Sequence, residues 1–410
     1  MEYNYLFQQP KLDVVKYVKI KHRGVWLFAS DSPALFLEKQ QMTNLNPVRS
    51  DKHIKLFIPG PTEVRPEILD AQGQWMLGHR MPECLELIGR IRPKLGIVFQ
   101  TEKRVLISAS TGSGLMEAAI RNTANGKVLN CVNGAFSQRW QEITEACGRE
   151  NEVLNAEWGQ PILPESVAAR LSAGGFDAIT VCHNETSTGV TNPIEAIAQA
   201  VRSVPNGDQI MILVDAVSSL AGVSIPFDAW DLDVLLTSSQ KVFALPAGIS
   251  FAAVSDRAMA KAATVPDRGW YFNFHVLEKY LLKNQTPATT AVSLLFALDK
   301  QLEDMLAEGM ENRYARHLAM RDRTIEWAES KGLTPFAPDG YRSPTVTCIT
   351  NDSNYDISAL NAFLRERGMI ISNGYGTLKG RNFRIAHMGD LQLADMEELF
   401  AAIDDFLAGV

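Results

Sequence analysis

The chain has 410 residues, of which 46% are hydrophobic and 21% are charged. This composition is ordinary for a soluble globular protein, and the length suggests two or three domains. The net charge of −7 gives no basic footprint for nucleic acid, and no run of about 18 apolar residues predicts a transmembrane helix.

Five cysteines are present without paired close spacings, which favours a reducing compartment over a disulfide framework. The opening stretch "MEYNYLFQQPKLDVVK" lacks the charged and apolar regions of a secretory signal. The closing stretch "DDFLAGV" is not a peroxisomal address. We therefore expect a cytoplasmic protein that binds neither nucleic acid nor a membrane.

Residues 1–55 differ in character from the rest of the chain and are predicted to form an N-terminal extension of unknown role. Short alternating apolar stretches lie on either side of "KHRG" (residues 21–24), which predicts a β-hairpin. The polar stretch "EKQQMTNLNPVRSDKH" that comes next is predicted to be a linker.

From about Leu56 the chain alternates short apolar runs with amphipathic segments. This pattern predicts an α/β fold with a mainly parallel sheet and helices on both faces. We assign this large domain to residues 56–305. The predicted strands are "RVLIS", "KVLNCV", "AITVCHN", "MILVDAV", "DVLLTSS" and "ISFAAVS", and the helical patterns are "GLMEAAIRNTA", "SQRWQEITEACG", "PESVAARLSAG" and "PIEAIAQAVRS".

The last third of the chain changes character. Two long helical patterns, "SLLFALDKQLEDML" and "ENRYARHLAMRDRTIEWAESKG", come first. Strand-like "TVTCIT" and "NFRIAH" then enclose helix-like "ISALNAFLRERG", and the chain closes with helical "DMEELFAAIDDFLA". We predict a smaller α+β domain over residues 306–410.

Ligands of parallel sheets bind at the carboxyl ends of the strands, and polar or aromatic residues follow five of the predicted strands. The first strand leads into a small-residue turn that opens a helix, where backbone N–H groups can bind an anion. In chain order the five features are the turn Ser110–Gly114, Phe136, the stretch Glu185–Gly189, Asp215 and Lys241.

Each feature also has a purely structural explanation: an ordinary turn, a core aromatic residue, a helix cap or a solvated loop lysine. Together they match the needs of one cofactor. Pyridoxal phosphate has a phosphate, a flat ring, a phenolic oxygen, a ring nitrogen that pairs with an acid, and an aldehyde that condenses with a lysine. The combination therefore predicts pyridoxal phosphate, and no metal.

The chain resembles the class V aminotransferases of fold type I, in the branch of the alanine:glyoxylate and serine:glyoxylate (or serine:pyruvate) enzymes. The resemblance runs from about Phe57 to the C-terminus and leaves residues 1–52 uncovered. It rests on the blocks "FIPGPTEVRPEILDAQ", "GHRMPECLELI", "FQTEKRVLISASTGSGLMEAA", "NGAFSQRW", "CHNETSTGV", "VDAVSSLAG", "SSQKVFALPAGISF" and "FRIAHMG", which come in the order of that family.

The resemblance implies a role for each residue of the cofactor site. Lys241 would form the covalent Schiff-base link, and Asp215 would keep the pyridine nitrogen protonated. Thr186 would lie near the phenolic oxygen. The phosphate would be bound by Gln240 and by the turn that contains Thr111, Gly112 and Ser113.

The resemblance also assigns the substrate site and a shared dimer site. Arg384 would bind the substrate carboxylate, and Gly60 would lie beside the substrate. Phe136 stands where this branch usually has a tryptophan over the ring. Thr286 lies in "NQTPATT", which resembles the segment that reaches the phosphate of a partner subunit, so we expect a homodimer.

The function implied is transamination between a small amino acid (alanine or serine) and a 2-oxo acid (glyoxylate or pyruvate). A phosphonate or phosphoserine transaminase is an alternative, for which His79 and Arg80 would supply the extra basic groups. A cysteine desulfurase would need a reactive cysteine, but Cys348 lies in a strand-like run where a buried core residue is expected. A non-catalytic subunit that binds a partner through residues 1–52 is a further alternative.

Overall fold

The computed structural model describes residues 17–22, 25–30 and 53–409. The chain divides into two compact units, Met1–His53 and Ile54–Val410, and each is described by itself. In the first unit, β1 (Tyr17–His22) pairs antiparallel with β2 (Val25–Ser30), which confirms the predicted hairpin. The predicted linker lies outside the described residues except for its last residue, His53.

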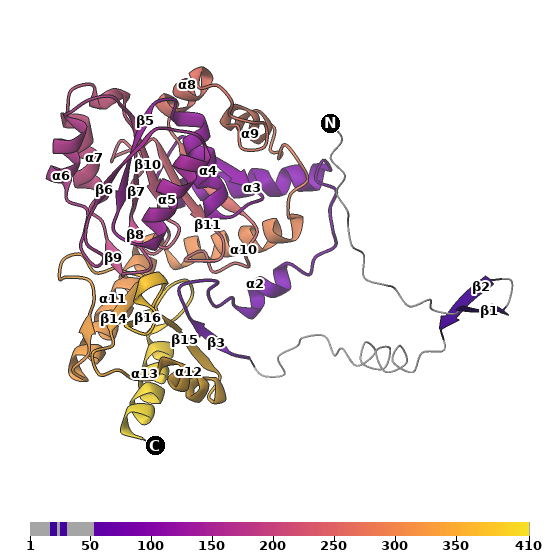
Figure 1. Ribbon diagram of the computed structural model, residues 1–410. Helices are drawn as coiled ribbons and strands as arrows, with labels where there is room; N and C mark the ends of the chain where they lie inside the picture. Colours follow the sequence, from indigo (N-terminus) through magenta and orange to yellow (C-terminus); the bar gives the residue numbers. More distant parts are fainter. Residues whose placement is uncertain (1–16, 23–24, 31–52, 410) are drawn as a thin grey trace, which may run out of the picture. The chain divides into compact units, whose positions relative to one another are not determined.

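A seven-stranded sheet lies in the second unit (Figure 1). Its strand order is β4-β12-β11-β10-β7-β5-β6, and every pair is parallel except the two that β12 makes. Apolar runs predict six of these strands, whereas the edge strand β6 has no such run, because its sequence "NEVLN" is half polar. The bounds are β4 (Arg104–Ser108), β5 (Lys127–Val132), β6 (Asn151–Asn155), β7 (Phe176–Cys182), β10 (Met211–Asp215), β11 (Val234–Ser238) and β12 (Ser250–Val254).

Helices cover both faces of this sheet, because its strands carry apolar side chains on both sides. In β4, for example, Leu106 packs on one face and its neighbours Val105 and Ile107 on the other. The face with Leu106 contacts α4 (Gly112–Thr123), α5 (Ala135–Ala146), α8 (Asp256–Thr264) and α9 (Phe274–Leu281). The opposite face contacts α2 (Pro66–Ala71), α3 (Pro82–Phe99), α6 (Pro164–Leu171), α7 (Ile194–Ser203) and α10 (Val292–Glu308).

A second sheet has five strands in the order β13-β14-β16-β15-β3 (Figure 1). Its strand β3 (Lys55–Phe57) precedes the large sheet in the chain and pairs parallel with β15. The other members are β13 (Thr334–Pro335), β14 (Val346–Thr350), β15 (Met369–Asn373) and β16 (Asn382–Ala386), and the accompanying helices are α11 (Met310–Ser330), α12 (Ile357–Glu366) and α13 (Leu393–Ala408). The boundary at residue 305 stays a prediction, since residues 54–410 form one compact unit.

The second sheet has its own apolar core. The stacked rings of Trp327 on α11 and Phe400 on α13, whose centroids are 4.7 Å apart, lie within it. Phe57 of β3 is fully buried in the same core. The segment after β3 is therefore fixed at both ends, by this core and by α2.

Among the described residues, no helix combines the length and the apolar character that a membrane span requires.

The topology of the large sheet brings the five predicted features to one edge. The parallel neighbours β11, β10, β7 and β5 end next to Lys241, Asp215, Thr186 and Phe136, in that order. Strand β12 is antiparallel, so its first residue, Ser250, lies at the same edge. A short polar link forms there, because the Ser250 Oγ lies 2.7 Å from the Ser110 Oγ in the turn after β4.

Candidate active site

Lys241 lies in a turn after β11, and its Nζ donates a hydrogen bond to the backbone carbonyl of Pro59. Burial of the amine lowers the pKa of Lys241 to about 8, and the nearby positive charges of Arg384 and Arg139 add to the effect. A solvated loop lysine would keep a pKa near its ordinary value of 10.5. The environment of Lys241 is instead that of a desolvated amine.

Gly60 lies directly against the Lys241 side chain. A Cβ at position 60 would lie 2.5 Å from the Lys241 Cδ, and the backbone has φ of +130°, so only glycine fits without strain. The next residues also hold the lysine turn: the Thr62 N–H donates to the Gln240 carbonyl (3.1 Å), and the Thr62 hydroxyl donates to the Lys241 carbonyl (2.8 Å). We call residues 59–62 the covering segment.

Asp215 is the last residue of β10, and its carboxylate is buried. Its Oδ1 accepts a hydrogen bond from the Val217 N–H (2.7 Å), and the Cys182 thiol lies 3.5 Å from Oδ2. Burial raises the pKa of Asp215 to about 6, and the charge of Glu185 acts in the same direction. A cation placed beside this carboxylate would offset that cost.

The predicted anion site lies at the start of α4. Thr111 is the N-cap residue, and its side chain makes no capping hydrogen bond. A Cβ at Gly112 would lie 2.5 Å from the Val217 Cγ2 and 3.6 Å from the Ser238 Oγ, so the glycine brings the helix N-terminus close to a serine hydroxyl. The Ser238 Oγ and the Gln240 Oε1 are buried without a hydrogen-bond partner.

Phe136 lies in the first turn of α5, between two cations and a second aromatic ring. Its ring stacks on Tyr375, with centroids 5.3 Å apart and planes 25° apart. The Arg139 guanidinium carbon lies 5.0 Å from the Phe136 centroid, and the Lys241 Nζ lies 5.9 Å from it. The Phe136 ring is therefore within reach of both the predicted anchor lysine and a loop of the second sheet.

Glu185 explains why Phe136 lies where it does. Its buried carboxylate accepts hydrogen bonds from the backbone N–H groups of Phe136 (3.2 Å) and Ser137 (2.8 Å), at the N-terminus of α5. Ser187 adds a hydroxyl donor at 2.6 Å. The neighbouring Thr186 is buried, and its hydroxyl donates to the Ser218 Oγ (2.8 Å).

Arg384 lies on β16 and is buried. Its Nε and Nη2 both donate to the Asn373 carbonyl (3.1 Å each), and Nη1 donates to the Thr186 carbonyl (3.2 Å). A guanidinium has five N–H donors, so one donor on each Nη remains for a ligand. Burial lowers the pKa of Arg384, and the Tyr375 ring lies 5.5 Å from its guanidinium carbon.

Thr286 lines a small cavity with Ser108 and Ala109, at the end of β4 that precedes the predicted anion turn. Its hydroxyl donates to the Ala288 carbonyl (2.8 Å). Arg80 donates to the carbonyls of Thr286 (2.7 Å) and Pro287 (3.1 Å), so these bonds occupy a residue that a second anion would need. Cys348 is buried in β14, and burial raises the pKa of its thiol to about 12, which disfavours a reactive thiolate.

Sequence reasoning missed Arg139 and Tyr375. Arg139 follows Phe136 by three residues on a helix, so a signal existed, because residues three apart share one helix face. Its Nη1 donates to the Ser113 Oγ (3.2 Å). Tyr375 gave no signal, since it lies in an irregular loop between β15 and β16 and reaches Phe136 only through the tertiary fold.

The residues at this edge fit pyridoxal phosphate. The buried Asp215 suits a pyridinium nitrogen, and the partnerless hydroxyl of Ser238 beside the α4 N-terminus suits a phosphate. The buried amine of Lys241 lies 5.9 Å from the centroid of the Phe136 ring, so an amine and an aromatic ring face are both present at this edge. The ring nitrogen, the phosphate, the aldehyde and the ring of the cofactor each have a chemically suitable group at this edge.

Comparisons with known proteins identify the family of the chain. The sequence profile of the family "Aminotransferase class-V" matches residues 69–387. The "Soluble hydrogenase, small subunit" of Synechococcus sp. is 36% identical over 361 residues, covering 86% of this chain and 92% of that protein. The serine–glyoxylate aminotransferase of Methylorubrum extorquens is 31% identical, covering 82% of this chain and 86% of that protein. The crystal structure of alanine–glyoxylate aminotransferase from Nostoc sp. has a TM-score of 0.83 and 28% identity, covering 90% of this chain and 99% of that chain.

The mainly parallel sheet, with helices on both faces and a smaller second sheet, is the fold of the fold type I aminotransferases, as predicted. The chain belongs to the class V aminotransferase family, whose members depend on pyridoxal phosphate.

Proposed function

We propose that this enzyme transfers an amino group between a small amino acid, alanine or serine, and a 2-oxo acid, glyoxylate or pyruvate. The observation that supports it most is the proximity of Lys241 to Asp215 and to Arg384, whose charges both act on the buried amine. The similarity to a serine–glyoxylate enzyme and to an alanine–glyoxylate enzyme supports glyoxylate as the acceptor and serine or alanine as the donor.

We assign the cofactor pyridoxal phosphate to the edge of the large sheet. Lys241 would hold it covalently, Asp215 would pair with its ring nitrogen, and Phe136 would pack on its ring. Thr186 would lie near the phenolic oxygen. The phosphate would be bound by Thr111, Gly112, Ser113, Ser238 and Gln240. When bound, the cofactor supplies an electron sink for the bonds at the substrate Cα.

Lys241 would move the proton at the substrate Cα. A general base works best when its pKa lies near the working pH, and burial lowers the pKa of Lys241 to about 8. The amine therefore exchanges a proton readily near neutral pH. Gly60 and the covering segment limit the access of water to the amine, since Nζ contacts the Pro59 carbonyl.

Arg384 would bind the α-carboxylate of both substrates. Its two remaining donors, one on each Nη, suit a two-pronged interaction with a carboxylate, which a lysine ammonium cannot make. The Tyr375 ring contacts both the Arg384 guanidinium and the Phe136 ring. The space between the carboxylate site and the ring face is therefore bounded by an aromatic side chain, which favours a small substrate side chain.

We further propose a homodimer in a reducing, cytoplasmic setting. Trp75 and Met76 precede α3 and are 92% and 70% exposed, which is unusual for large apolar side chains. They lie close in sequence to Arg80, which binds the Thr286 carbonyl. A second copy of the chain would cover them, and Thr286 would then contact the partner's phosphate. The five cysteines are all free, which supports the proposed reducing setting.

A half-reaction screen tests the proposed function. The purified holoprotein is mixed with one amino acid at a time: alanine, serine, aspartate or phosphoserine. The absorbance band of the lysine-bound cofactor, near the short-wavelength end of the visible spectrum, is followed over time. We expect alanine or serine to remove the band fastest. A band removed fastest by phosphoserine would favour the phosphoserine-type alternative, and a protein without any such band would favour a non-catalytic subunit.

A further inference from the structure

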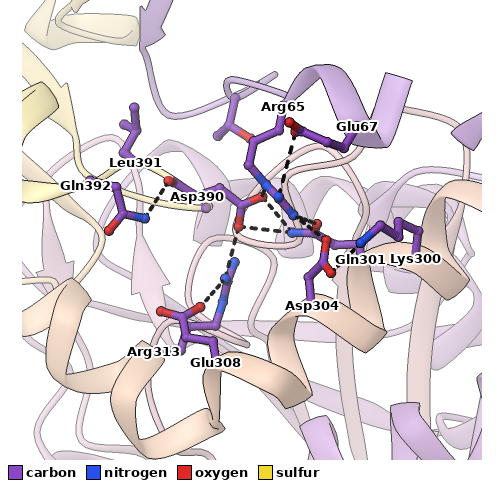
Figure 2. Close-up of polar contacts among 12 residues, drawn as sticks. Arg65, Glu67, Lys300, Gln301, Asp304, Glu308, Arg313, Asp390, Leu391 and Gln392 are labelled. Atoms are coloured by element: carbon purple, nitrogen blue, oxygen red, sulfur yellow. Dashed lines mark hydrogen bonds and ion pairs between the residues drawn. The ribbon is translucent and has the colours of Figure 1, made fainter. Parts of the chain in front are cut away.

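Figure 2 shows a polar cluster in which side chains from several helices meet at Asp390. It is built around Asp390, in the loop between β16 and α13, and we call it the Asp390 cluster. Its other members come from the start of α2, from α10 and from the start of α11. They are Arg65, Gln301, Asp304, Glu308 and Arg313.

The Asp390 carboxylate receives donors from three segments of the chain. Arg65 donates through Nε (2.6 Å), Gln301 through Nε2 (2.9 Å), and Arg313 through Nη1 (3.0 Å). Burial alone would raise the pKa of Asp390, but the Arg313 and Arg65 guanidiniums outweigh it and lower the pKa. The carboxylate is therefore held ionised between two cations.

Arg313 extends this contact to the catalytic side of the sheet. The residue is 1% exposed. Its Nη2 donates to the carbonyl of Val242 (3.0 Å), the residue after Lys241, and its Nε donates to the carbonyl of Ala221 (3.1 Å), in the stretch after β10. Ala221 has φ of +74°, a conformation that a non-glycine residue keeps only when its surroundings hold it.

Two more contacts connect the cluster to the site. Arg65 follows the covering segment by three residues, so its bond to Asp390 fixes the end of the chain that lies over Lys241. Gly389 packs beside the lysine turn, because a Cβ at that position would lie 3.0 Å from the Ala244 Cβ and 3.8 Å from the Lys241 carbonyl oxygen. The Asp390 loop leaves β16, the strand that carries Arg384.

We propose that Arg313 and Asp390 are positioning residues, whose buried ion pair fixes the turn that carries Lys241. The same pair ties that turn to the covering segment and to the end of the strand that carries Arg384. The distance between the Lys241 amine and the Arg384 guanidinium is thereby fixed, although the two residues are carried by elements of different sheets. This inference rests on the proposed function of Lys241.

The choice of arginine follows from the number of acceptors. Nε, Nη1 and Nη2 of Arg313 together serve two backbone carbonyls and two carboxylates, those of Asp390 and Glu308. A lysine has one nitrogen and cannot reach acceptors that surround a planar fork. Arg313→Lys would therefore keep the charge and lose the bonds to the Lys241 turn.

The test compares Arg313→Met, Arg313→Lys and Asp390→Asn with a control, Asp299→Asn. Asp299 on α10 is also a buried carboxylate that receives two cations, Arg90 (2.9 Å) and Lys94 (2.8 Å). That pairing joins α10 to α3 and makes no contact with the lysine turn. A loss of stability without an effect on Lys241 is therefore expected for the control alone.

The readout is the pH dependence of Lys241 labelling in the cofactor-free protein. The label is introduced by reductive methylation, and its extent at Lys241 is measured by peptide mass analysis. The parent should give a pKa of about 8. The Arg313 variants should shift it toward 10.5, the value of a solvated lysine, because a loosened turn lets the amine reach water. In the holoenzyme, Arg313→Lys should lower kcat on the order of 10²-fold, as expected for a misplaced catalytic group.

An unchanged labelling pKa in folded Arg313→Lys and Asp390→Asn, or an equal shift in Asp299→Asn, would overturn the proposal. If Arg313→Met does not fold, the two conservative variants decide. Borohydride treatment of the parent holoprotein is run in parallel. A parent whose Lys241 carries no reduced cofactor contradicts the proposed function, whereas the labelling pKa still reports on the position of the lysine.

Discussion

Asp215 ends strand β10, Lys241 lies in the turn after the adjacent parallel strand β11, and each favours the charged form of the other. Burial opposes both charges: it raises the pKa of Asp215 to about 6 and lowers the pKa of Lys241 to about 8. Both groups therefore lose favourable hydration when they are charged in the buried site, and their mutual attraction offsets only part of that cost. Perturbed pairs of this kind are typical of catalytic sites.

Asp215→Asn should lower turnover strongly. The carboxylate would stabilise a protonated ring nitrogen by charge pairing, and an amide cannot. The loss should be on the order of 3 kcal/mol of transition-state stabilisation, or roughly 10²-fold in kcat, as for other strong electrostatic contacts. Steady-state kinetics at saturating cofactor measure it, and a turnover within a few-fold of the parent would refute the role.

The same substitution should stabilise the cofactor-free protein above pH 6. The pKa of Asp215 is raised from 3.8 to about 6 on folding, so its contribution to stability is complete below pH 3.8 and is lost as the pH rises through 6. The difference corresponds to on the order of 3 kcal/mol. Thermal unfolding of the cofactor-free parent and variant should coincide near pH 4 and diverge toward pH 8, in favour of Asp215→Asn; parallel curves would contradict the pKa.

Arg384→Lys should raise KM for both the amino acid and the 2-oxo acid, because a point charge replaces a two-pronged donor. A rise of roughly tenfold or more is expected, equivalent to one charge-assisted hydrogen bond of about 1.5–3 kcal/mol. The Asn373 and Thr186 carbonyls that now accept from Arg384 would also lose donors. Unchanged KM values for both substrates would count against the assignment.

Mixed dimers test whether the active site is shared between subunits. Lys241→Ala should be inactive, and Thr286→Val should have weakened cofactor affinity without unfolding. A dimer of one subunit of each kind would have one site with both defects and one with neither, so part of the activity should return at limiting cofactor. Verified mixed dimers without regained activity, or a fully active monomer in sedimentation, would rule out the shared site.

Much of the large sheet could be predicted from the sequence, because its strands are continuous apolar runs that end at chemically distinctive residues. The parallel order then places Phe136, Asp215 and Lys241 at one edge without further information. Strand β6 was not predicted, because this edge strand has partly exposed side chains and no apolar run. Its absence from the prediction changed nothing at the site.

The contacts between the sheets could not be predicted in this way. Tyr375 reaches Phe136 from a loop more than 200 residues away in sequence, and Asp390 is an ordinary acidic residue until the fold places Arg65 and Arg313 around it. The resemblance to the family singles out Gly60, but it does not show why glycine is needed there. The structure shows that a side chain at position 60 would collide with the Lys241 side chain. Such roles depend on tertiary packing, for which no local pattern exists.

Reduction of the holoprotein with borohydride, followed by digestion and mass analysis, tests the central claim most directly. We predict one modified peptide, with the reduced cofactor on Lys241, and no modified peptide in Lys241→Ala, which should also lose nearly all turnover. A cofactor attached to another lysine, or a Lys241→Ala variant that keeps both the reducible link and its turnover, would contradict the account.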